Sequence, residues 1–370
     1  MQRIICSAAA ILVLSATPVL NQARDQGAPA NKPVPSATIA DKKPVFAGAC
    51  KACPWGILAS VTAEALKFYG YETQICWVCA TTMGPRQVAD KTKPKPLNMA
   101  GAATEIPANW IEPPPDAVPD FGATSEVNLI NAWNGTGDYA KDNKQRRNYR
   151  VIAVVRTSTY MLAAASKKSG ITNLNQIQDR RQPTFIERGS DADIVFDYYG
   201  IKPEEIKAKG GAILQAVIGG TREHRASADV FIGTGLMANT PEQGWWNEAS
   251  QLNDLVFLDF EEPLIAKLAQ EPGFMRAAAP LGLLRGVVRP IPTVMRPNHV
   301  IYARDDTPDD FAYAVAKALD EHRELFQVQL EPWYYDSRTV AVSRVIPLHP
   351  GAIKYYRERG YTIGTDAGRP

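Results

Sequence analysis

The sequence predicts an α/β protein of two lobes, each a mostly parallel sheet flanked by helices. Strand-like and helix-like apolar segments alternate along the chain, which is the pattern of strand–helix–strand units. The alternation runs through two series, and at 370 residues the chain is longer than one hydrophobic core usually serves. We therefore expect a first lobe over 44–165, a second lobe over 166–290 and a return to the first lobe over 291–370.

The first series begins with an apolar strand over Pro44–Ala49 and a helix over Trp55–Tyr69, which Gly70 ends. Residues 90–118 hold six prolines and show no periodicity, so a long surface loop is expected there. The other segments of this series are predicted as strands over Glu72–Cys79, Asp120–Thr124, Tyr149–Val155 and Thr159–Ala164, a helix from the cap Ser125 through Trp133, and a short helix over Asn173–Gln178.

The second series has shorter segments of the same two kinds, bounded by Gly and Pro. Its predicted strands are Thr184–Glu187, Ala212–Ile218, Asp229–Gly233, Leu255–Asp259 and, returning to the first lobe, Thr293–Ala303. Its predicted helices are Ser190–Tyr199, His224–Ala228, Pro263–Gln270, Asp309–Gln327 and the C-terminal Gly351–Arg359.

The N-terminus has the pattern of a secretory signal peptide. A basic start at Met1–Arg3 precedes an apolar run over Ile4–Leu14, which is too short to span a membrane. We expect a signal peptide over 1–23 and a flexible leader over 24–43. No later stretch approaches the ~20 apolar residues that a membrane helix needs. The mature protein is therefore expected to be exported and soluble.

Charge and motifs argue against several function classes. Lys and Arg number 41 against 39 Asp and Glu, a net charge of +2, so nothing calls for nucleic acid or an anionic membrane as a partner. The sequence has no Gly-rich phosphate loop, no Gly-x-Ser-x-Gly and no His-Glu-x-x-His. We expect a monomer that is not an enzyme, with no cofactor and no catalytic residues.

Two Cys-x-x-Cys pairs remain once Cys6 leaves with the signal peptide: Cys50 with Cys53, and Cys76 with Cys79. Their spacing is compatible with a tetrahedral zinc site. An even number of cysteines in an oxidising compartment favours disulfides, and Cys53-Pro-Trp opens a helix where a zinc ribbon would have a hairpin. We expect disulfides, with a metal site or reactive thiols as the alternatives.

Three segments together resemble one known family. They are VIPLHPGAIKYYRERGY (345–361), SADVFIGTG (227–235) and PDDFAYAVAKALDEHRELF (308–326). Over roughly residues 44–361 the chain is similar to the TAXI-type solute receptors of tripartite ATP-independent periplasmic (TRAP) transporters. The resemblance implies a type II periplasmic-binding-protein fold, with one small ligand in a cleft between two lobes and a membrane permease as partner. It also implies a periplasmic location and a small carboxylate as ligand.

This sequence departs from the family at two turns. CKACPWG (50–56) stands where the family usually has a Gly-rich turn, and ERGSDAD (187–193) where it tends to have Gly-Ser-Gly-Thr. The first two strands are neighbours in the family, so the resemblance implies that the two cysteine motifs meet. Residues 76 and 79 would face opposite sides of an extended strand. We therefore predict at least one disulfide between the two motifs rather than two local ones.

Candidate ligand-binding residues follow the expected strands at the edge where helices begin, because helix N-termini and free backbone N–H groups favour anions there. Arg156 ends a strand at the presumed hinge and could bind a carboxylate through both nitrogens, or form an interdomain salt bridge. Thr81, Thr82 and Ser125 could contact a ligand or only cap helices. The full set is Trp55, Thr81, Thr82, Ser125, Arg156, Tyr160, Arg188, Ser190, Asp191, Gly233 and Thr234.

We interpret the sequence as an exported receptor that captures a small, carboxylate-bearing molecule and delivers it to a membrane transporter. The alternative is a periplasmic redox or metal-binding protein, or an enzyme, that uses the two Cys-x-x-Cys pairs on the same scaffold. Fold alone does not decide between them.

Overall fold

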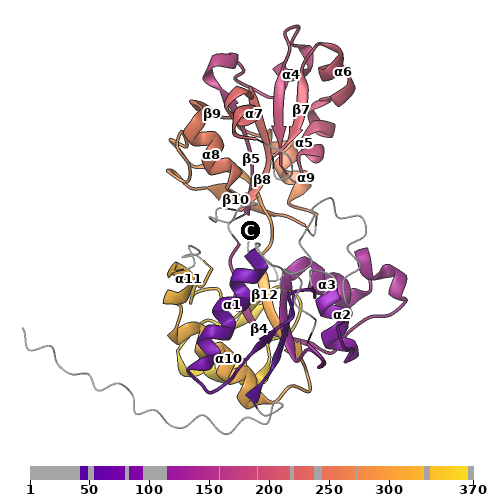
Figure 1. The fold of residues 1–370 in the computed structure, drawn as a ribbon, viewed down its shortest axis with the longest axis vertical. Coiled ribbons are helices and arrows are strands. Elements are labelled where there is room, and N and C mark those ends of the chain that lie inside the picture. The colour runs from indigo at the N-terminus through magenta and orange to yellow at the C-terminus, as the bar shows by residue number, and fades with distance from the viewer. Residues whose placement is uncertain are drawn as a thin grey trace, which may run out of the picture. The chain divides into compact units, whose positions relative to one another are not determined.

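A computed structural model gives the fold (Figure 1). The predicted signal peptide, nearly all of the predicted leader and most of the predicted loop over 90–118 lie outside the residues it describes. Within those residues, no helix combines the length and apolar character needed to cross a bilayer. The described residues are 42–48, 54–79, 83–94, 115–157, 159–189, 191–216, 221–236, 244–271, 273–328 and 334–365.

The first sheet has the strand order β2-β1-β3-β12-β4. Strand β1 pairs in parallel with β2 and β3, whereas β12 runs antiparallel to both β3 and β4. The inner strands β1, β3 and β12 are buried over nearly their whole length, as expected for a sheet covered by helices. The bounds are β1 (Val45–Ala47), β2 (Gln74–Ile75), β3 (Phe121–Ser125), β4 (Tyr149–Val155) and β12 (His299–Arg304).

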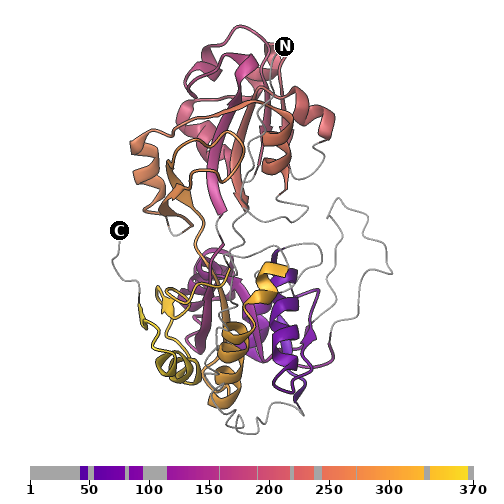
Figure 2. The same ribbon diagram turned by 90° about the vertical axis from the view of Figure 1, so that its left-hand side faces the viewer.

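Helices from both ends of the chain cover this sheet. In Figure 1, α1 lies beside α10, and in Figure 2 the C-terminal segment, drawn in yellow, lies beside α10, consistent with the contacts of α10 with α1 and α12. These helices are α1 (Pro54–Lys67), α2 (Met83–Asp90), α3 (Glu126–Asn134), the 3-10 helix η3 (Gly137–Asp142), α10 (Asp309–Glu321), α11 (Glu324–Val328) and α12 (Pro350–Glu358).

The second sheet has the order β10-β11-β5-β8-β6-β7, with β9 paired to β5. Strand β6 is parallel to β7 and β8, and the other pairs are antiparallel. The bounds are β5 (Thr159–Ser166), β6 (Phe185–Arg188), β7 (Ala212–Gln215), β8 (Val230–Leu236), β9 (Leu255–Phe257), β10 (Met275–Ala279) and β11 (Ile291–Met295).

Alternate residues of β5 enter two different hydrophobic clusters on the two faces of this sheet. Met161 and Ala163 pack with α5, α6 and α9, whereas Leu162 and Ala164 pack with α8. Alternation places successive side chains on opposite faces, so both faces are covered. The helices are α4 (Gln176–Asp179), α5 (Ala192–Tyr199), α6 (Pro203–Ala208), α7 (Arg222–Ser227), α8 (Trp245–Leu252) and α9 (Glu262–Leu268).

The predicted class, α/β with two sheets flanked by helices, is confirmed, although the strand directions are mixed. The chain enters the second sheet through β5 and returns to the first through β12, and each of these strands runs against its neighbours. The single strand predicted over Thr293–Ala303 is two strands, β11 and β12, which belong to different sheets. The predicted strand Glu72–Cys79 is only Gln74–Ile75, because the chain turns at Trp77 and Val78.

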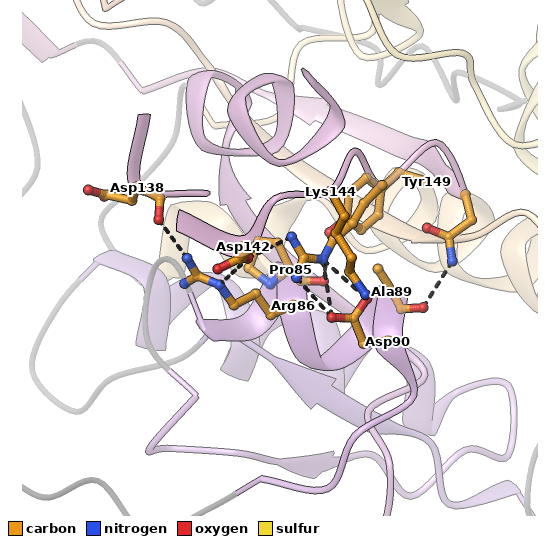
Figure 3. A network of polar contacts seen from close by, with 10 residues as sticks. Pro85, Arg86, Ala89, Asp90, Asp138, Asp142, Lys144 and Tyr149 are labelled. Carbon is orange, nitrogen blue, oxygen red and sulfur yellow. Dashed lines mark hydrogen bonds and ion pairs between the residues drawn. The ribbon is translucent and has the colours of Figure 1, made fainter. Parts of the chain in front are cut away.

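A network of charged residues fastens η3 and the segment after it to α2 (Figure 3). The guanidinium of Arg146, with 4% of its side chain exposed, contacts Asp90 at 2.9 Å and Asp142 at 2.7 Å. Arg86 donates to Asp142 at 2.7 Å, and Lys144 lies 2.7 Å from Asp90. These basic side chains are therefore paired with carboxylates of the same lobe, and Arg146 is buried.

Candidate functional site

The first sheet gathers polar and aromatic residues at one edge, which we call the first edge: Trp55, Ser125, Arg156 and His299. Strand register explains the gathering. His299 begins β12 and stands opposite both Ser125, which ends β3, and Val155, which ends β4. Arg156 follows Val155 directly, and Trp55 lies in the first turn of α1, which follows β1. Three of these four residues were predicted site residues.

The imidazole of His299 stacks on the indole of Trp55. Their ring centroids are 3.8 Å apart with an angle of 23° between the planes. Burial and, to a smaller extent, the positive charge of Arg296 lower the pKa of His299 to about 3, so the ring is neutral near pH 7. Its Nδ1 atom is buried and makes no hydrogen bond within the described residues. A neutral ring with an unused nitrogen can exchange one hydrogen bond with a ligand.

Ser125 starts α3 as predicted. Its backbone is extended, and its hydroxyl oxygen accepts from the N–H of Asn128 at 3.1 Å. The next N–H, that of Glu126, donates to the carbonyl of Asn298 at 2.9 Å. The helix start is thus tied to the segment between β11 and β12 and satisfies part of its own free N–H groups.

Arg156 forms an ion pair with Asp336, with 3.0 Å between Nη1 and Oδ2. Arg338 binds the same carboxylate at 2.8 Å. Hydrogen bonds from Arg338, together with the charges of Arg338 and Arg156, lower the pKa of Asp336 to about 2. Two guanidinium groups share one carboxylate here, so this trio carries one net positive charge.

The second sheet has a comparable edge, which we call the second edge. Parallel strands β6 and β8 end there at Arg188 and at residues 233–236. Antiparallel β5 begins there, with Tyr160 opposite Gly235 and Met295. The register brings together Tyr160, Arg188, Asp191, Gly233, Thr234 and Arg296.

The backbones approach each other closely at this edge. A Cβ atom on Gly233, whose φ is +150°, would lie 2.7 Å from the Cα of Gly189. The N–H of Gly189 donates to Ile232 O at 2.8 Å. The indole of Trp245 packs against Gly189, and its N–H makes no hydrogen bond within the described residues. Glycine at both positions is required because no side chain fits between the strands.

Asp191 is the charged centre of the second edge. Its carboxylate accepts from Arg296 Nε at 3.0 Å, from Arg296 Nη2 at 2.6 Å and from the Thr234 hydroxyl at 2.8 Å. Asp191 precedes α5 with φ 62° and ψ 4°, and its side chain makes no capping hydrogen bond to that helix. Nearby, Arg188 pairs with Asp193.

The cysteine pairing differs from the prediction. Cys76 and Cys79 form a disulfide with each other, with their Cα atoms 5.4 Å apart. Both are fully buried, and the N–H of Cys79 donates to Cys76 O at 3.3 Å. The predicted bridge from these two residues to the other motif is therefore wrong. The strand ends at Ile75, and the turn that follows brings side chains three residues apart together.

Five predicted residues lie outside the described part of the chain: Thr81, Thr82, Ser190, Cys50 and Cys53. Among the described residues, no group of three or more His, Cys, Asp or Glu side chains is placed to hold a metal ion. With Cys76 and Cys79 joined to each other, a four-thiolate zinc site of the kind considered above cannot form in this state.

Sequence reasoning missed Arg296 and His299, which flank Pro297 in a segment predicted as one continuous strand. The signal was present, because Pro lacks the N–H that an inner strand needs. A break at Pro297 would have placed both residues at strand ends, as His299 is at β12 and Arg296 is just after β11.

Comparison with known proteins gives a family and several distant structural likenesses. The model of the NMT1-like family matches residues 116–360. MatC from Rhodopseudomonas palustris with bound malate is 11% identical, with 80% of this chain and 90% of that chain covered and a TM-score of 0.40. A TctC solute binding protein from Polaromonas without ligand is 9% identical, with 80% and 90% covered and a TM-score of 0.41.

A third solved structure is the alkanesulfonate-binding protein SsuA from Xanthomonas axonopodis pv. citri bound to MOPS. It is 10% identical, with 77% of this chain and 75% of that chain covered and a TM-score of 0.31. At these low scores, none of the three carries weight in the choice of a ligand.

Proposed function

The chain belongs to the NMT1-like family, and from that premise we propose that it is an exported solute-binding receptor. The receptor captures a small carboxylate-bearing molecule between the first and second edges and delivers it to a membrane permease. It is a carrier of its ligand rather than an enzyme. The TAXI-like segments over 227–235, 308–326 and 345–361 make a TRAP-type permease the partner to test first.

One observation supports the proposal most strongly. The first and the second edge share three features. A helix begins at each, a glycine or a small polar residue leaves the backbone accessible, and an arginine is held by an ion pair. Ligands of open α/β sheets bind outside such strand ends. Two edges of this kind on two sheets, joined by the segments β4–β5 and β11–β12, suit a small ligand held from both sides.

The charge at the first edge supports an anionic ligand. Arg156 and Arg338 share the single carboxylate of Asp336, so one guanidinium charge remains to attract an anion. Arg156 has 36% of its side chain exposed, which leaves donors available on a fork that matches a carboxylate. Neutral His299 and the indole of Trp55 add a hydrogen-bonding atom and an aromatic face.

We assign ligand contact to Trp55, Ser125, Arg156, Tyr160, Arg188, Asp191, Gly233 and Thr234, with Thr81, Thr82 and Ser190 as predicted additions. The Cys76–Cys79 disulfide supports export, because disulfides persist in oxidising compartments. It also weakens the redox and metal alternative, since these two sulfur atoms are buried and already bonded.

The test is a thermal-unfolding screen of the exported protein against monocarboxylates, dicarboxylates, amino acids and the corresponding amides. A ligand that binds only the folded state stabilises that state by mass action, by about 2.7 kcal/mol at a concentration 100 times its Kd. The unfolding temperature rises as a result. We expect a carboxylate to do so and its amide to fail. A screen in which carboxylates and amides behave alike would reject the carboxylate receptor, and native mass spectrometry of the co-purified solute would provide the replacement candidate.

A further inference from the structure

We propose that Arg296 and Thr234 form a carboxylate-binding subsite at the second edge, and that Asp191 occupies it until a ligand carboxylate takes its place. The inference rests on the proposed receptor function and names the residues that would recognise the ligand's charged group. It also assigns a role to Arg296, which the sequence pattern did not single out.

The carboxylate of Asp191 already shows how such a group is held. Arg296 donates from Nε to Oδ2 at 3.0 Å and from Nη2 to Oδ1 at 2.5 Å, and the Thr234 hydroxyl donates to Oδ2 at 2.8 Å. Two parallel donors from one guanidinium match the two oxygens of a carboxylate. Thr234 is buried on β8, with 4% of the residue exposed, so the third donor has a fixed position. This is the donor set that a ligand carboxylate would need.

Asp191 is an unusual permanent occupant of this position. A residue in front of a helix with a carboxylate side chain normally caps the helix N-terminus, but the Asp191 side chain makes no such hydrogen bond to α5. Its φ of 62° lies in the region that non-glycine residues seldom adopt. Asp191 thus has a second favourable place for its carboxylate, on the first N–H groups of α5, once another carboxylate holds Arg296.

Charge and exposure make the exchange feasible. A ligand carboxylate keeps the guanidinium of Arg296 neutralised, and the displaced carboxylate of Asp191 then lies at the positive N-terminal end of α5. The side chain of Arg296 is 46% exposed, whereas that of Asp191 is 16% exposed, so a solute reaches the guanidinium from solvent. A sulfonamide, an amide or an alcohol carries no charge to neutralise Arg296 in place of Asp191, so the subsite selects carboxylates over neutral solutes.

Asp191→Gly provides the test, with acetate as the probe. Glycine suits the positive φ of this position and removes the internal carboxylate while keeping Arg296 and Thr234. Acetate should bind this variant at least about 10-fold more tightly than it binds the wild-type protein, because a charge-assisted hydrogen bond no longer competes with it. Binding is read from the rise in unfolding temperature with acetate against chloride at equal ionic strength.

Two variants control the result. Asp191→Gly combined with Arg296→Gln should lose the gain, since the guanidinium is gone. Asp197→Ala removes an exposed carboxylate of α5 while Arg188 keeps Asp193 and Arg296 keeps Asp191, and it should leave acetate binding as in the wild-type protein. If Asp191→Gly fails to fold, Asp191→Asn keeps the side-chain size without the charge, and the same 10-fold gain, read by NMR titration, is expected.

Acetate that stabilises the Asp191 variants no more than chloride does would overturn the exchange. So would an equal gain in Asp197→Ala, because the effect would then be one of net charge alone. The ligand screen on the wild-type protein tests the receptor function separately. If a solute binds the wild-type protein but acetate binds the Asp191 variants no more tightly, the subsite is refuted and the receptor function stands. If acetate binds the Asp191 variants more tightly but no solute binds the wild-type protein, the subsite stands and the receptor function is refuted.

Discussion

Tyr355 donates its hydroxyl proton to the buried carboxylate of Asp320, with 2.7 Å between the two oxygens, and so joins α12 to α10. Tyr361 reaches the same carboxylate at 2.7 Å and Arg359 Nε at 3.0 Å. Three residues of the segment over 345–361, which carries the family resemblance, therefore converge on Asp320 of α10, which is 2% exposed. Its tyrosines and arginine hold α12 and the residues up to Tyr361 on α10 rather than line either edge.

Asp320→Asn should lower the free energy of unfolding by about 3 kcal/mol, because Arg359 and two tyrosine hydroxyls lose a charged, buried acceptor. Chemical denaturation measures it. The matched control is Glu358→Gln, whose carboxylate accepts from Tyr313 between the same two helices at 2.6 Å but on an exposed surface, and whose loss should cost less than about 1 kcal/mol. Equal costs for the two variants would show that burial at Asp320 contributes nothing.

His299 predicts a loss of stability in mild acid. Its pKa falls from the usual value near 6.5 to about 3 in the folded protein, so the unfolded chain binds the proton more readily. The stabilising contribution is complete above pH 6.5 and is lost as the pH falls through about 3. Between pH 6.5 and 5 the wild-type protein should lose stability relative to His299→Gln, by about 1 kcal/mol per pH unit.

The measurement is urea unfolding of both proteins across this pH range, with His224→Gln, at an exposed site on α7, as the control for losing one imidazole. A constant difference between wild-type protein and His299→Gln at all pH values would mean that the ring titrates alike in both states. The stack on Trp55 would then not exclude the charged form.

The Cys76–Cys79 bond closes a loop of four residues, for which the chain-entropy estimate is about 2 kcal/mol of stability. The double variant Cys76→Ala/Cys79→Ala should therefore fold, but its free energy of unfolding should be lower by that amount. Chemical denaturation measures the difference. Non-reducing tryptic mapping should find both cysteines oxidised within the one peptide between Lys67 and Arg86. A peptide cross-linked from 50 or 53 to 76 or 79 would contradict the local pairing.

Arg156→Ala should weaken binding of the solute found in the screen by about 2 kcal/mol, roughly 30-fold, as expected for loss of a charge-assisted contact. Arg338→Ala is the comparison variant, because it removes a guanidinium from the same Asp336 while its own side chain is 81% exposed. It should lose the net positive charge but keep the direct contact of Arg156, and so weaken binding less than Arg156→Ala. Calorimetric titration of both variants decides. If affinity is unchanged in Arg156→Ala while stability drops, Arg156 serves only as a salt bridge.

How much of the fold the sequence determined varies from element to element. Alternating apolar segments were enough to predict β4 within its observed bounds Tyr149–Val155 and α12 within a residue of each end. Ser125 as a helix start followed from its side chain alone. These features rest on local periodicity and capping, which a sequence displays directly.

Strand direction and pairing were decided only by tertiary structure. Nothing in the apolar run over 293–303 states that its halves belong to different sheets, although Pro297 marks the break. The cysteine pairing was predicted wrongly because the strand was expected to reach Cys79, which would keep Cys76 and Cys79 on opposite faces. The strand has only two residues, and the turn after it brings Cys76 and Cys79 together. Element boundaries depend on packing against distant segments and are only weakly encoded locally.

The candidate site divides in the same way. Residue types and their places after predicted strands were sufficient to nominate Trp55, Ser125, Arg156, Asp191 and Thr234. Which of them touch came only from the structure, since Arg296 lies 105 residues from Asp191 in sequence and Asp336 lies 180 from Arg156. A sequence shows a side chain's chemistry, but its charged partner is chosen by strand register across the sheet, and register is a property of the folded chain.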